Sequence, residues 1–191
     1  MEHAFVRLAS EGSLTLYFRE WLLKGAEGLP GQPAAQSSIL SQWRGIEGLK
    51  RDLKRLVGAS SESRVLVASR SAQLMRLAAK LLFERCCNVL TTDLSWPSYQ
   101  RILEAEAHRT GRRVTRVSLR RRLLIHGIDD DQAVDLLTWA VGRYGCDGLF
   151  LPAVDNLGVR LPMQKIVAAI EGRHEVHFTV VDGAQALAHV P

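Results

Sequence analysis

The sequence predicts an α/β protein with a mostly parallel, doubly wound sheet that follows a set of N-terminal helices. From residue 64 onward, short apolar runs alternate with longer segments in which apolar residues recur at helical spacing. Strands that alternate with helices form parallel sheets, because each crossover needs a helix-sized connection. With 191 residues and 47% hydrophobic content, the chain suits one domain or one large part of a bigger domain.

Residues 1–60 are predicted to form an N-terminal helical segment, and residues 61–191 the α/β part. Leucines and aromatic residues between positions 14 and 22 indicate a first amphipathic helix that ends near Gly25. Residues 25–38 are rich in Gly, Pro, Gln and Ser, which is typical of a loop. A second helix is predicted to stop at Gly58, and its apolar face consists of Ile46, Leu49, Leu53 and Leu56.

The α/β part is predicted to contain strands at residues 65–68, 89–92, 114–119, 149–151 and 178–181. The helices between them have apolar faces formed by Leu74, Leu77, Ala78, Leu81 and Leu82, by Ile102, Leu103 and Ala107, by Leu136, Leu137 and Ala140, and by Ile166, Val167 and Ile170. Asp129, Asp130 and Asp131 begin the third of these helices, since acids at a helix start complement the helix dipole and offer a cap. Gly111 and Gly145 are expected to end helices, and Pro162 to begin one.

The charge distribution bears on possible partners. The formal net charge is +5, and arginines cluster at positions 109, 112, 113, 116, 120, 121 and 122. This cluster could contact nucleic acid, lie solvated on the surface, or meet an acidic partner chain. No aromatic residue interleaves with these arginines, so nucleic acid is the disfavoured alternative.

Cysteine usage and hydropathy bear on the compartment. The three cysteines, of which Cys86 and Cys87 are adjacent, form neither a disulfide framework nor a CxxC metal site. We expect them to be buried thiols in a reducing cytoplasm. No apolar run is long enough for a membrane span, and the first residues lack the layout of a signal peptide, so a cytoplasmic protein without membrane contact is expected.

Several segments that follow predicted strands carry polar or aromatic residues. The last predicted strand ends in Asp182, followed by Gly183, Ala184 and Gln185. An acid at the carboxyl end of a strand in an α/β sheet lies where such folds bind ligands. Ser71, Ala72 and Gln73 begin the first helix of the α/β part, where free N–H groups favour an anion. Trp96 stands between a strand end and Pro97, and Asp155 and Asn156 precede Gly158.

Taken in this order, the segments resemble the pyridoxal-phosphate site of class V aminotransferase-fold enzymes of fold type I, which include cysteine desulfurases and isopenicillin-N-epimerase-like proteins. The resemblance implies that Ser71, Ala72 and Gln73 bind the cofactor phosphate and that Trp96 stacks on the pyridine ring. It implies that Asp182 pairs with the protonated ring nitrogen and that Gln185 contacts the ring hydroxyl.

The resemblance also places a substrate-binding segment at Asp155 and Asn156. Aligned on Gly158, the polar residue of the family falls on Asp155, and Asn156 lies one position away. The Ser-His pair that usually opens this family motif is missing here. An aspartate at this position would repel a substrate carboxylate.

The resemblance further implies that this chain is an incomplete large domain. The family's Schiff-base lysine follows the position of Asp182, whereas the five lysines here, Lys24, Lys50, Lys54, Lys80 and Lys165, all precede it. No catalytic residue is therefore expected in this chain. The strands at 65–68 and 178–181 are expected to lack neighbours until a C-terminal half on another chain, a homodimer mate, or both, complete the sheet.

The expected function is part of a pyridoxal-phosphate-dependent enzyme acting on a small amino acid, of the desulfurase, lyase, epimerase or aminotransferase type. The alternative is a non-catalytic cofactor-binding or scaffold protein with a degenerate form of the same fold. A Rossmann-type nucleotide binder is disfavoured because no GxGxxG follows a predicted strand. An RNA-contacting protein that uses the arginine cluster is the fourth hypothesis.

Overall fold

The computed structural model of the chain describes residues 22–25, 43–155 and 157–187. The chain divides into two compact units, Met1–Val67 and Ala68–Pro191. In the first unit, helix α3 spans Gly45–Leu56, and Gly58 follows it with a φ of 60°, as the sequence predicts. Residues 22–24 are helical, but the rest of the first predicted helix, and most of the loop predicted at 25–38, lie outside the described residues.

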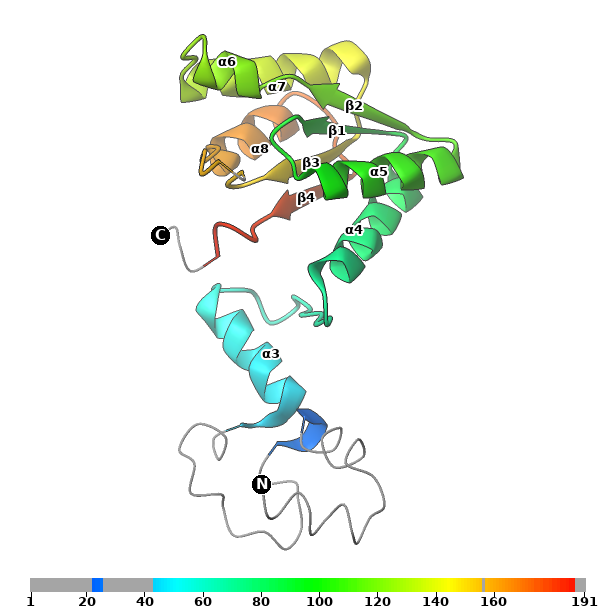
Figure 1. Cartoon of the computed structure of the whole chain (residues 1–191), viewed down its shortest axis with the longest axis vertical. Coiled ribbons are helices and arrows are strands. Elements are labelled where there is room, and N and C mark those ends of the chain that lie inside the picture. The colour runs from blue at the N-terminus through cyan, green and yellow to red at the C-terminus, as the bar shows by residue number, and fades with distance from the viewer. Residues whose placement is uncertain (1–21, 26–42, 156, 188–191) are drawn as a thin grey trace, which may run out of the picture. The chain divides into compact units, whose positions relative to one another are not determined.

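The second unit is built on four parallel strands in the order β2-β1-β3-β4 (Figure 1). The strands are β1 at Asn88–Thr92, β2 at Arg113–Val117, β3 at Gly148–Pro152 and β4 at Phe178–Asp182. Both central strands, β1 and β3, are buried along their whole length. This arrangement confirms the predicted parallel α/β fold.

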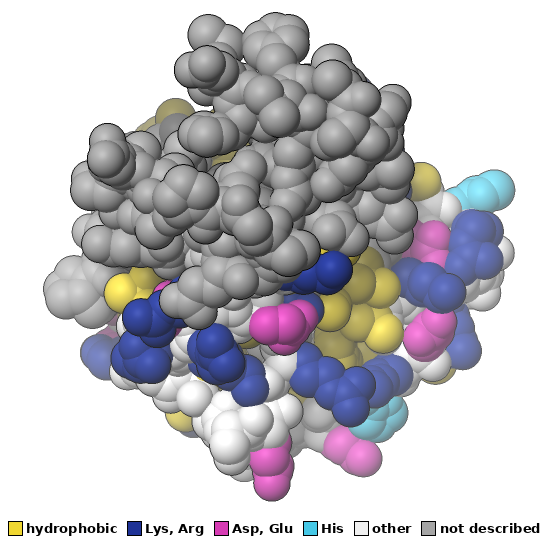
Figure 2. Space-filling model, turned by 90° about the horizontal axis from the view of Figure 1, so that it is seen from below, with side chains coloured by type: hydrophobic (Ala, Val, Ile, Leu, Met, Phe, Trp, Pro, Cys, Tyr) yellow, Lys and Arg dark blue, Asp and Glu magenta, His cyan; other side chains and the backbone are white. Residues whose placement is uncertain are grey.

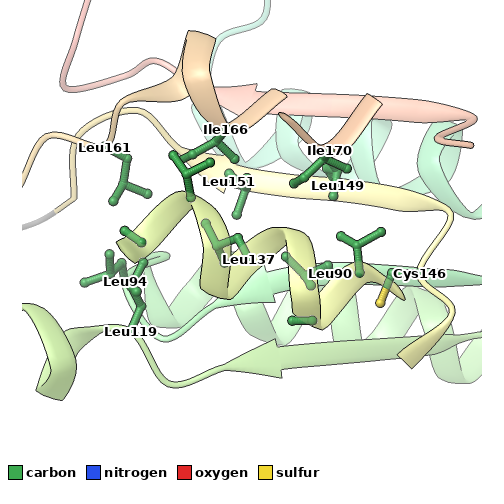
Figure 3. Packing of buried hydrophobic residues seen from close by; sticks show 14 residues of the cluster. Leu90, Leu94, Leu119, Leu137, Cys146, Leu149, Leu151, Leu161, Ile166 and Ile170 are labelled. Atoms are coloured by element: carbon green, nitrogen blue, oxygen red, sulfur yellow. The ribbon is translucent and has the colours of Figure 1, made fainter. Parts of the chain in front are cut away.

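Helices cover both faces of this sheet. On one face, α4 at Ser71–Arg85 and α5 at Pro97–Thr110 pack over a cluster that includes Phe83, Val89 and Phe150. On the other face, α7 at Asp130–Tyr144 and α8 at Met163–Glu171 pack over a second cluster. Figure 3 shows its fully buried side chains meeting between strands and helices, among them Leu90, Leu137, Leu149 and Ile166. The unit is therefore doubly wound, with one apolar layer on each side of the sheet.

The helix boundaries follow the signals in the sequence. Asp129 caps α7 and forms a capping box: its Oδ1 accepts the Gln132 N–H at 2.8 Å, and Gln132 Oε1 accepts the Asp129 N–H at 3.1 Å. Gly111 and Gly145 end α5 and α7 in the left-handed conformation, with φ of 66° and 60°. Such conformations favour glycine because it has no Cβ, so these predictions are confirmed.

Two predicted strands differ from the structure. Residues 65–68 form no strand, and Leu66 and Val67 are 59% and 47% exposed. A short apolar run becomes a strand only when another strand accepts its backbone hydrogen bonds. The strand predicted at 114–119 ends at Val117, because Asp93 Oδ1 accepts the N–H groups of Leu119 and Arg120 and the chain turns into a short helix, α6 at Arg120–Leu124.

The buried face of α4 also differs from the prediction. Met75, Ala79, Leu82 and Phe83 are buried, whereas Leu74 and Leu77 are 39% and 38% exposed. Apolar residues occupy most of the circumference of α4, so their spacing does not decide which side faces the sheet. A second apolar side of this helix therefore remains on the surface.

The two edges of the sheet carry opposite kinds of side chain. The edge strand β2 presents the exposed Arg113 and Arg116, which protect a strand from pairing with other chains. The other edge strand, β4, carries no charge before Asp182; Val181 is 44% exposed, and Thr179 Oγ1 is buried without a hydrogen bond to any described residue. Elsewhere, Figure 2 shows hydrophobic side chains at the surface bordered by lysine and arginine side chains.

The cysteines are free thiols, and only two of them are buried. Cys86 and Cys146 are buried as predicted, but Cys87 is exposed, and its Sγ lies 2.5 Å from Arg112 Nη1. No group of His, Cys, Asp or Glu side chains within the described ranges could hold a metal ion. None of the described helices is both long and apolar enough to cross a bilayer.

Candidate functional site

The strand order places a switch point between β1 and β3. From β1 the chain continues into α5 on one face of the sheet, and from β3 into α8 on the other face. In open α/β sheets, ligands bind in the crevice outside the carboxyl ends of the strands at such a point. The two loops that border it here contain Trp96 and Asp155, both predicted as site residues.

Several hydrogen bonds hold the loop that carries Trp96. Thr91 Oγ1 and Ser95 Oγ, both buried, lie 3.1 Å apart, and Gln100 Nε2 donates to the Ser95 carbonyl at 2.7 Å. The Trp96 carbonyl accepts the N–H groups of Tyr99 and Gln100 at the start of α5. The side chain of Trp96 remains 38% exposed at the carboxyl edge. The loop therefore presents a partly exposed aromatic side chain from a hydrogen-bonded backbone.

Two residues that support this loop were missed by the sequence analysis. Gln100 also accepts a hydrogen bond from Arg116 Nη1 at 3.0 Å, which links the loop to β2. Asp93 ties the other end of the loop to Leu119 and Arg120 at 2.8 and 2.9 Å. The position of Gln100, one helical turn after Trp96, is the sequence signal that could have identified it.

Asp155 shapes the loop between β3 and α8. It is 2% exposed, and its Oδ1 accepts the N–H groups of Leu157 at 2.7 Å and Val159 at 2.8 Å. Its Oδ2 is also buried and has no hydrogen bond to the described part of the chain. Buried polar atoms normally have partners, so Oδ2 is an acceptor still available to a ligand or water. Asn156 lies outside the described residues.

Asp182 lies beside this loop at the end of β4. The register pairs it with Pro152, and its carbonyl accepts the Ala153 N–H at 2.9 Å. Its Oδ1 accepts the Ala184 N–H at 3.1 Å, and the half-buried carboxylate borders the carboxyl edge. Gln185 follows in a turn and is exposed.

The start of α4 is expected to lie toward the same edge. At the other end of this helix, the Arg85 guanidinium stacks 4.8 Å from the ring centroid of Phe178, the first residue of β4. The helix runs back from there for about 20 Å and β4 runs forward for about 16 Å, so the start of α4 lies toward the carboxyl end of β4. Antiparallel packing of α4 on β4 would thus direct residues 71–73 toward this edge.

The first turn of α4 has no side-chain cap. The N-cap residue is Arg70, which makes no capping hydrogen bond, so Ser71 does not cap the helix. Ser69 Oγ donates to Gln73 Oε1 at 3.1 Å, which leaves the amide nitrogen of Gln73 to donate elsewhere. Ser71 and Gln73 are exposed and Ala72 is half-buried. Uncapped N–H groups at a helix start attract an anion.

Trp96, Asp155 and Asp182 therefore lie at or just after the carboxyl ends of β1, β3 and β4, along one edge of the sheet. Asp182 and the Asp155 loop are neighbours, whereas β3 separates the end of β1, which leads to Trp96, from the end of β4 by about 10 Å in all. Convergence of the predicted residues on a single pocket stays a prediction. The edge combines anion-attracting N–H groups, an aromatic side chain and two carboxylates, which fits a planar ligand with a phosphate and a cationic ring nitrogen.

Two solved structures resemble the fold of this chain. The complex of the cystine C–S lyase C-DES with its reaction product cysteine persulfide has a TM-score of 0.60 and 20% sequence identity, over 75% of this chain and 37% of C-DES. The fold of this chain therefore resembles part of the C-DES fold. A C-DES mutant with lysine replaced by alanine, in which glycine is covalently linked to the PLP cofactor, has a TM-score of 0.59 and 20% identity over 75% of this chain and 36% of that one.

The chain spans little more than a third of the length of C-DES. The match rests on structure: no family profile and no curated protein matches the sequence.

Proposed function

We propose that this chain is the N-terminal part of the cofactor-binding domain of a pyridoxal-phosphate-dependent enzyme that acts on a small amino acid. The observation that carries the proposal is the position of Asp182, a half-buried carboxylate at the carboxyl end of β4 in a sheet that resembles that of C-DES. Within the class V group, the likeness to C-DES favours C–S bond cleavage of the lyase or desulfurase type over epimerase and aminotransferase reactions.

Each predicted site residue has a separate role in this proposal. Bound pyridoxal phosphate supplies an electron sink for reactions at the amino acid. Asp182 keeps the ring nitrogen protonated, Trp96 packs on the ring, and Gln185 bonds the ring hydroxyl. The uncapped start of α4, with Ser71 and Gln73, holds the phosphate.

The substrate is proposed to lie beside Asp155 and Asn156. The buried Oδ2 of Asp155 lacks a partner, so a donor such as an amino group fits there better than a carboxylate. Asp155 thereby orients the nitrogen end of the substrate. This assignment explains how an aspartate can replace the usual polar residue of the family at this position.

The lysine required for covalent attachment of the cofactor is proposed to come from a partner. Lys80 lies 3.8 Å from Glu84 and Lys165 lies 3.1 Å from Asp131, so both pair with acids on helix surfaces. The partner would supply a C-terminal half on another chain, a homodimer mate, or both. The uncharged edge of β4 is where it would extend the sheet, and a cytoplasmic oligomer is the proposed working form.

Binding of pyridoxine 5′-phosphate, which has no aldehyde and does not react with surface lysines, tests the site directly. Equilibrium dialysis should show saturable binding to the full chain. The Asp182→Ala variant should bind at least roughly tenfold more weakly, because a charge-assisted hydrogen bond is worth about 1.5–3 kcal/mol. The control Asp130→Ala changes an acid on α7 and should leave binding intact.

Equal binding by the wild-type chain and Asp182→Ala, or no saturable binding, would contradict the proposed site. Borohydride reduction with pyridoxal phosphate, followed by peptide mapping, tests the missing lysine. Stoichiometric labelling of one lysine in this chain would overturn the proposal that the lysine comes from a partner. If the chain binds the cofactor but no partner chain makes it catalytically active, the alternative of a non-catalytic cofactor-binding protein would be favoured.

A further inference from the structure

Helix α7 carries two large aromatic side chains on its outer surface. Trp139 is 57% exposed and Tyr144 is 48% exposed. Their rings meet edge to face, with centroids 6.0 Å apart and planes at 77°. Arg143, also exposed, lies between them in sequence. Trp, Tyr and Arg are the residues that most often dominate protein–protein interfaces, so this surface is suited to binding another protein.

A hollow of about 530 Å³ adjoins Trp139. It lies between α7 and the residues that follow α8, and Thr138, Gly142, Arg173 and His174 help to line it. Gly142 allows the close approach of the two segments, since a Cβ at this position would lie 2.7 Å from His174 Cε1. The surface thus offers both a protruding indole and a recess next to it.

The two charges that α7 contributes to this surface flank Trp139 symmetrically, while Arg173 from the segment after α8 adds a further positive charge beside the hollow. Asp135, Trp139 and Arg143 follow one another at intervals of four residues, so they lie along one stripe of α7. All three are exposed. The acid lies one turn before the tryptophan and the base one turn after it. A two-fold axis through Trp139, perpendicular to the helix, therefore brings each Asp135 opposite an Arg143.

We propose that α7 binds α7 of a second copy of this chain in antiparallel orientation, with the two-fold axis at Trp139. Asp135 of each copy pairs with Arg143 of the other, and each indole packs toward the hollow of the opposite copy. Such an interface is self-complementary, as a two-fold dimer requires. Electrostatic complementarity of this kind fixes register and excludes wrong partners.

This contact is separate from the candidate cofactor site. Asn88 Nδ2 donates to the Tyr144 carbonyl at 2.9 Å, so the end of α7 lies at the start of β1 and at the amino edge of the sheet. The site residues lie at the carboxyl edge. The α7 contact also leaves the edge of β4 open, so it goes beyond the proposed function and does not depend on it.

Charge reversal tests the contact with the full chain, by light scattering after size-exclusion chromatography over a range of concentrations. Asp135→Arg and Arg143→Asp each place like charges opposite one another, so each alone should raise the dimer dissociation constant at least roughly tenfold. An equimolar mixture of the two variants should dimerise like the wild type, because each pair then has opposite charges again. The double variant should also dimerise.

Trp139→Ala should abolish the dimer, and Arg101→Asp on α5, an exposed charge on the other face, should leave it unchanged. Circular dichroism confirms that each variant is folded, and rescue by mixing cannot arise from a folding defect. A monomeric wild type at every concentration would overturn the proposal. So would single reversals that leave the dimer intact, or a dimer that is lost only on Val181→Lys at the β4 edge.

Discussion

At the scale of single residues, Asp147 connects three strands at the amino edge of the sheet. Its carboxylate accepts the N–H of Cys87 at 2.8 and 2.9 Å and that of Asn88 at 2.8 Å, just before and at the start of β1. Its carbonyl accepts the His177 N–H at 2.8 Å, just before β4. Asp147 itself immediately precedes β3. One residue thus links the starts of three of the four strands, through its side chain to β1 and through its backbone to β4.

Replacing Asp147 by alanine should therefore lower the free energy of unfolding by about 2–4 kcal/mol, because charge-assisted bonds are lost and two N–H groups lose their acceptor. Asp147→Asn, which keeps one acceptor oxygen, should lower the free energy of unfolding by less than Asp147→Ala does. Urea denaturation measures both changes. The control is Asp131→Ala, whose exposed pairing with Lys165 should contribute nothing measurable. Equal stability of the two alanine variants would contradict the prediction.

Burial also sets the chemistry of the neighbouring thiol. Desolvation, aided by the negative charge of Asp147, raises the pKa of Cys86 to about 11 from its ordinary value of 9.0. Above pH 9 the unfolded chain therefore loses this proton while the native chain keeps it. The stability contribution is complete below pH 9 and is lost as the pH rises to about 11.

Cys86→Ala should consequently reduce the fall in unfolding free energy between pH 9 and about 11. Cys146, whose pKa burial also raises, adds to the same fall. Urea denaturation at several pH values gives the unfolding free energy as a function of pH, and therefore its slope with pH, for each protein. Met75→Ala is the control, since it removes a buried side chain without a titratable group and should lower stability while keeping the slope. An unchanged slope in Cys86→Ala would refute the assignment.

At the scale of elements, α4 is the helix that the sequence describes least well. Leu82 is fully buried, whereas Leu77 on the neighbouring side is 38% exposed. Both were predicted to face the core. The difference arises because tertiary contacts with the sheet, rather than the spacing of apolar residues, select the buried side.

Leu82→Ala should lower the free energy of unfolding by about 2–5 kcal/mol, the usual cost of a cavity in a core. Leu77→Ala should cost less than about 1 kcal/mol, because exposed positions rarely cost more. The pair forms a matched control within one helix, and thermal or urea unfolding separates the two outcomes. If Leu77→Ala lost more unfolding free energy than Leu82→Ala, the buried face predicted from the sequence would be supported instead.

Local signals account for the elements that were predicted correctly. The capping box at Asp129 and the left-handed Gly111 and Gly145 act within a few residues, so the sequence shows them directly. In contrast, the absence of a strand at residues 65–68 and the presence of the short helix α6 depend on contacts with residues that are distant in sequence. Asp93, which ends β2 through Leu119, is 26 residues away in sequence.

The same reasoning applies to the candidate site. Strand ends in the sequence indicate that Trp96 and Asp182 lie at the carboxyl edge of the sheet, which is where the structure has them, while their role as a site stays a prediction. The sequence could not show that Asp155 bonds its own loop and leaves one buried oxygen unpaired, because that geometry depends on where Leu157 and Val159 lie. It also could not show that Cys87 is exposed, since a thiol next to a buried cysteine has no distinguishing local pattern.

At the scale of the whole second unit, the sheet is protected on one edge and open on the other. Arg113 and Arg116 are exposed on β2, while β4 presents Val181 and an unpaired Thr179 hydroxyl. Unprotected edges pair with other strands, whether in assembly or in aggregation. Association through strand pairing is therefore expected to occur at β4.

Val181→Lys should slow aggregation of the full chain on heating, as followed by light scattering at fixed concentration, because it places a charge on the open edge. Arg113→Val should have the opposite effect by removing a charge from the protected edge. Circular dichroism before heating verifies that both variants are folded. Faster aggregation of Val181→Lys, or no change in either variant, would show that the edges do not control association.

The junction at Asp147 makes the amino edge of the sheet the rigid end of this unit. Backbone amides whose hydrogen bonds join several strands exchange with solvent only when the whole cooperative unit opens, whereas loops open locally at lower cost. We therefore expect the amides of Asn88 and His177 to be among the slowest to exchange deuterium. The loops at the carboxyl edge should exchange earlier, so that the end carrying the candidate site can adjust to a ligand while the opposite end acts as a fixed pivot.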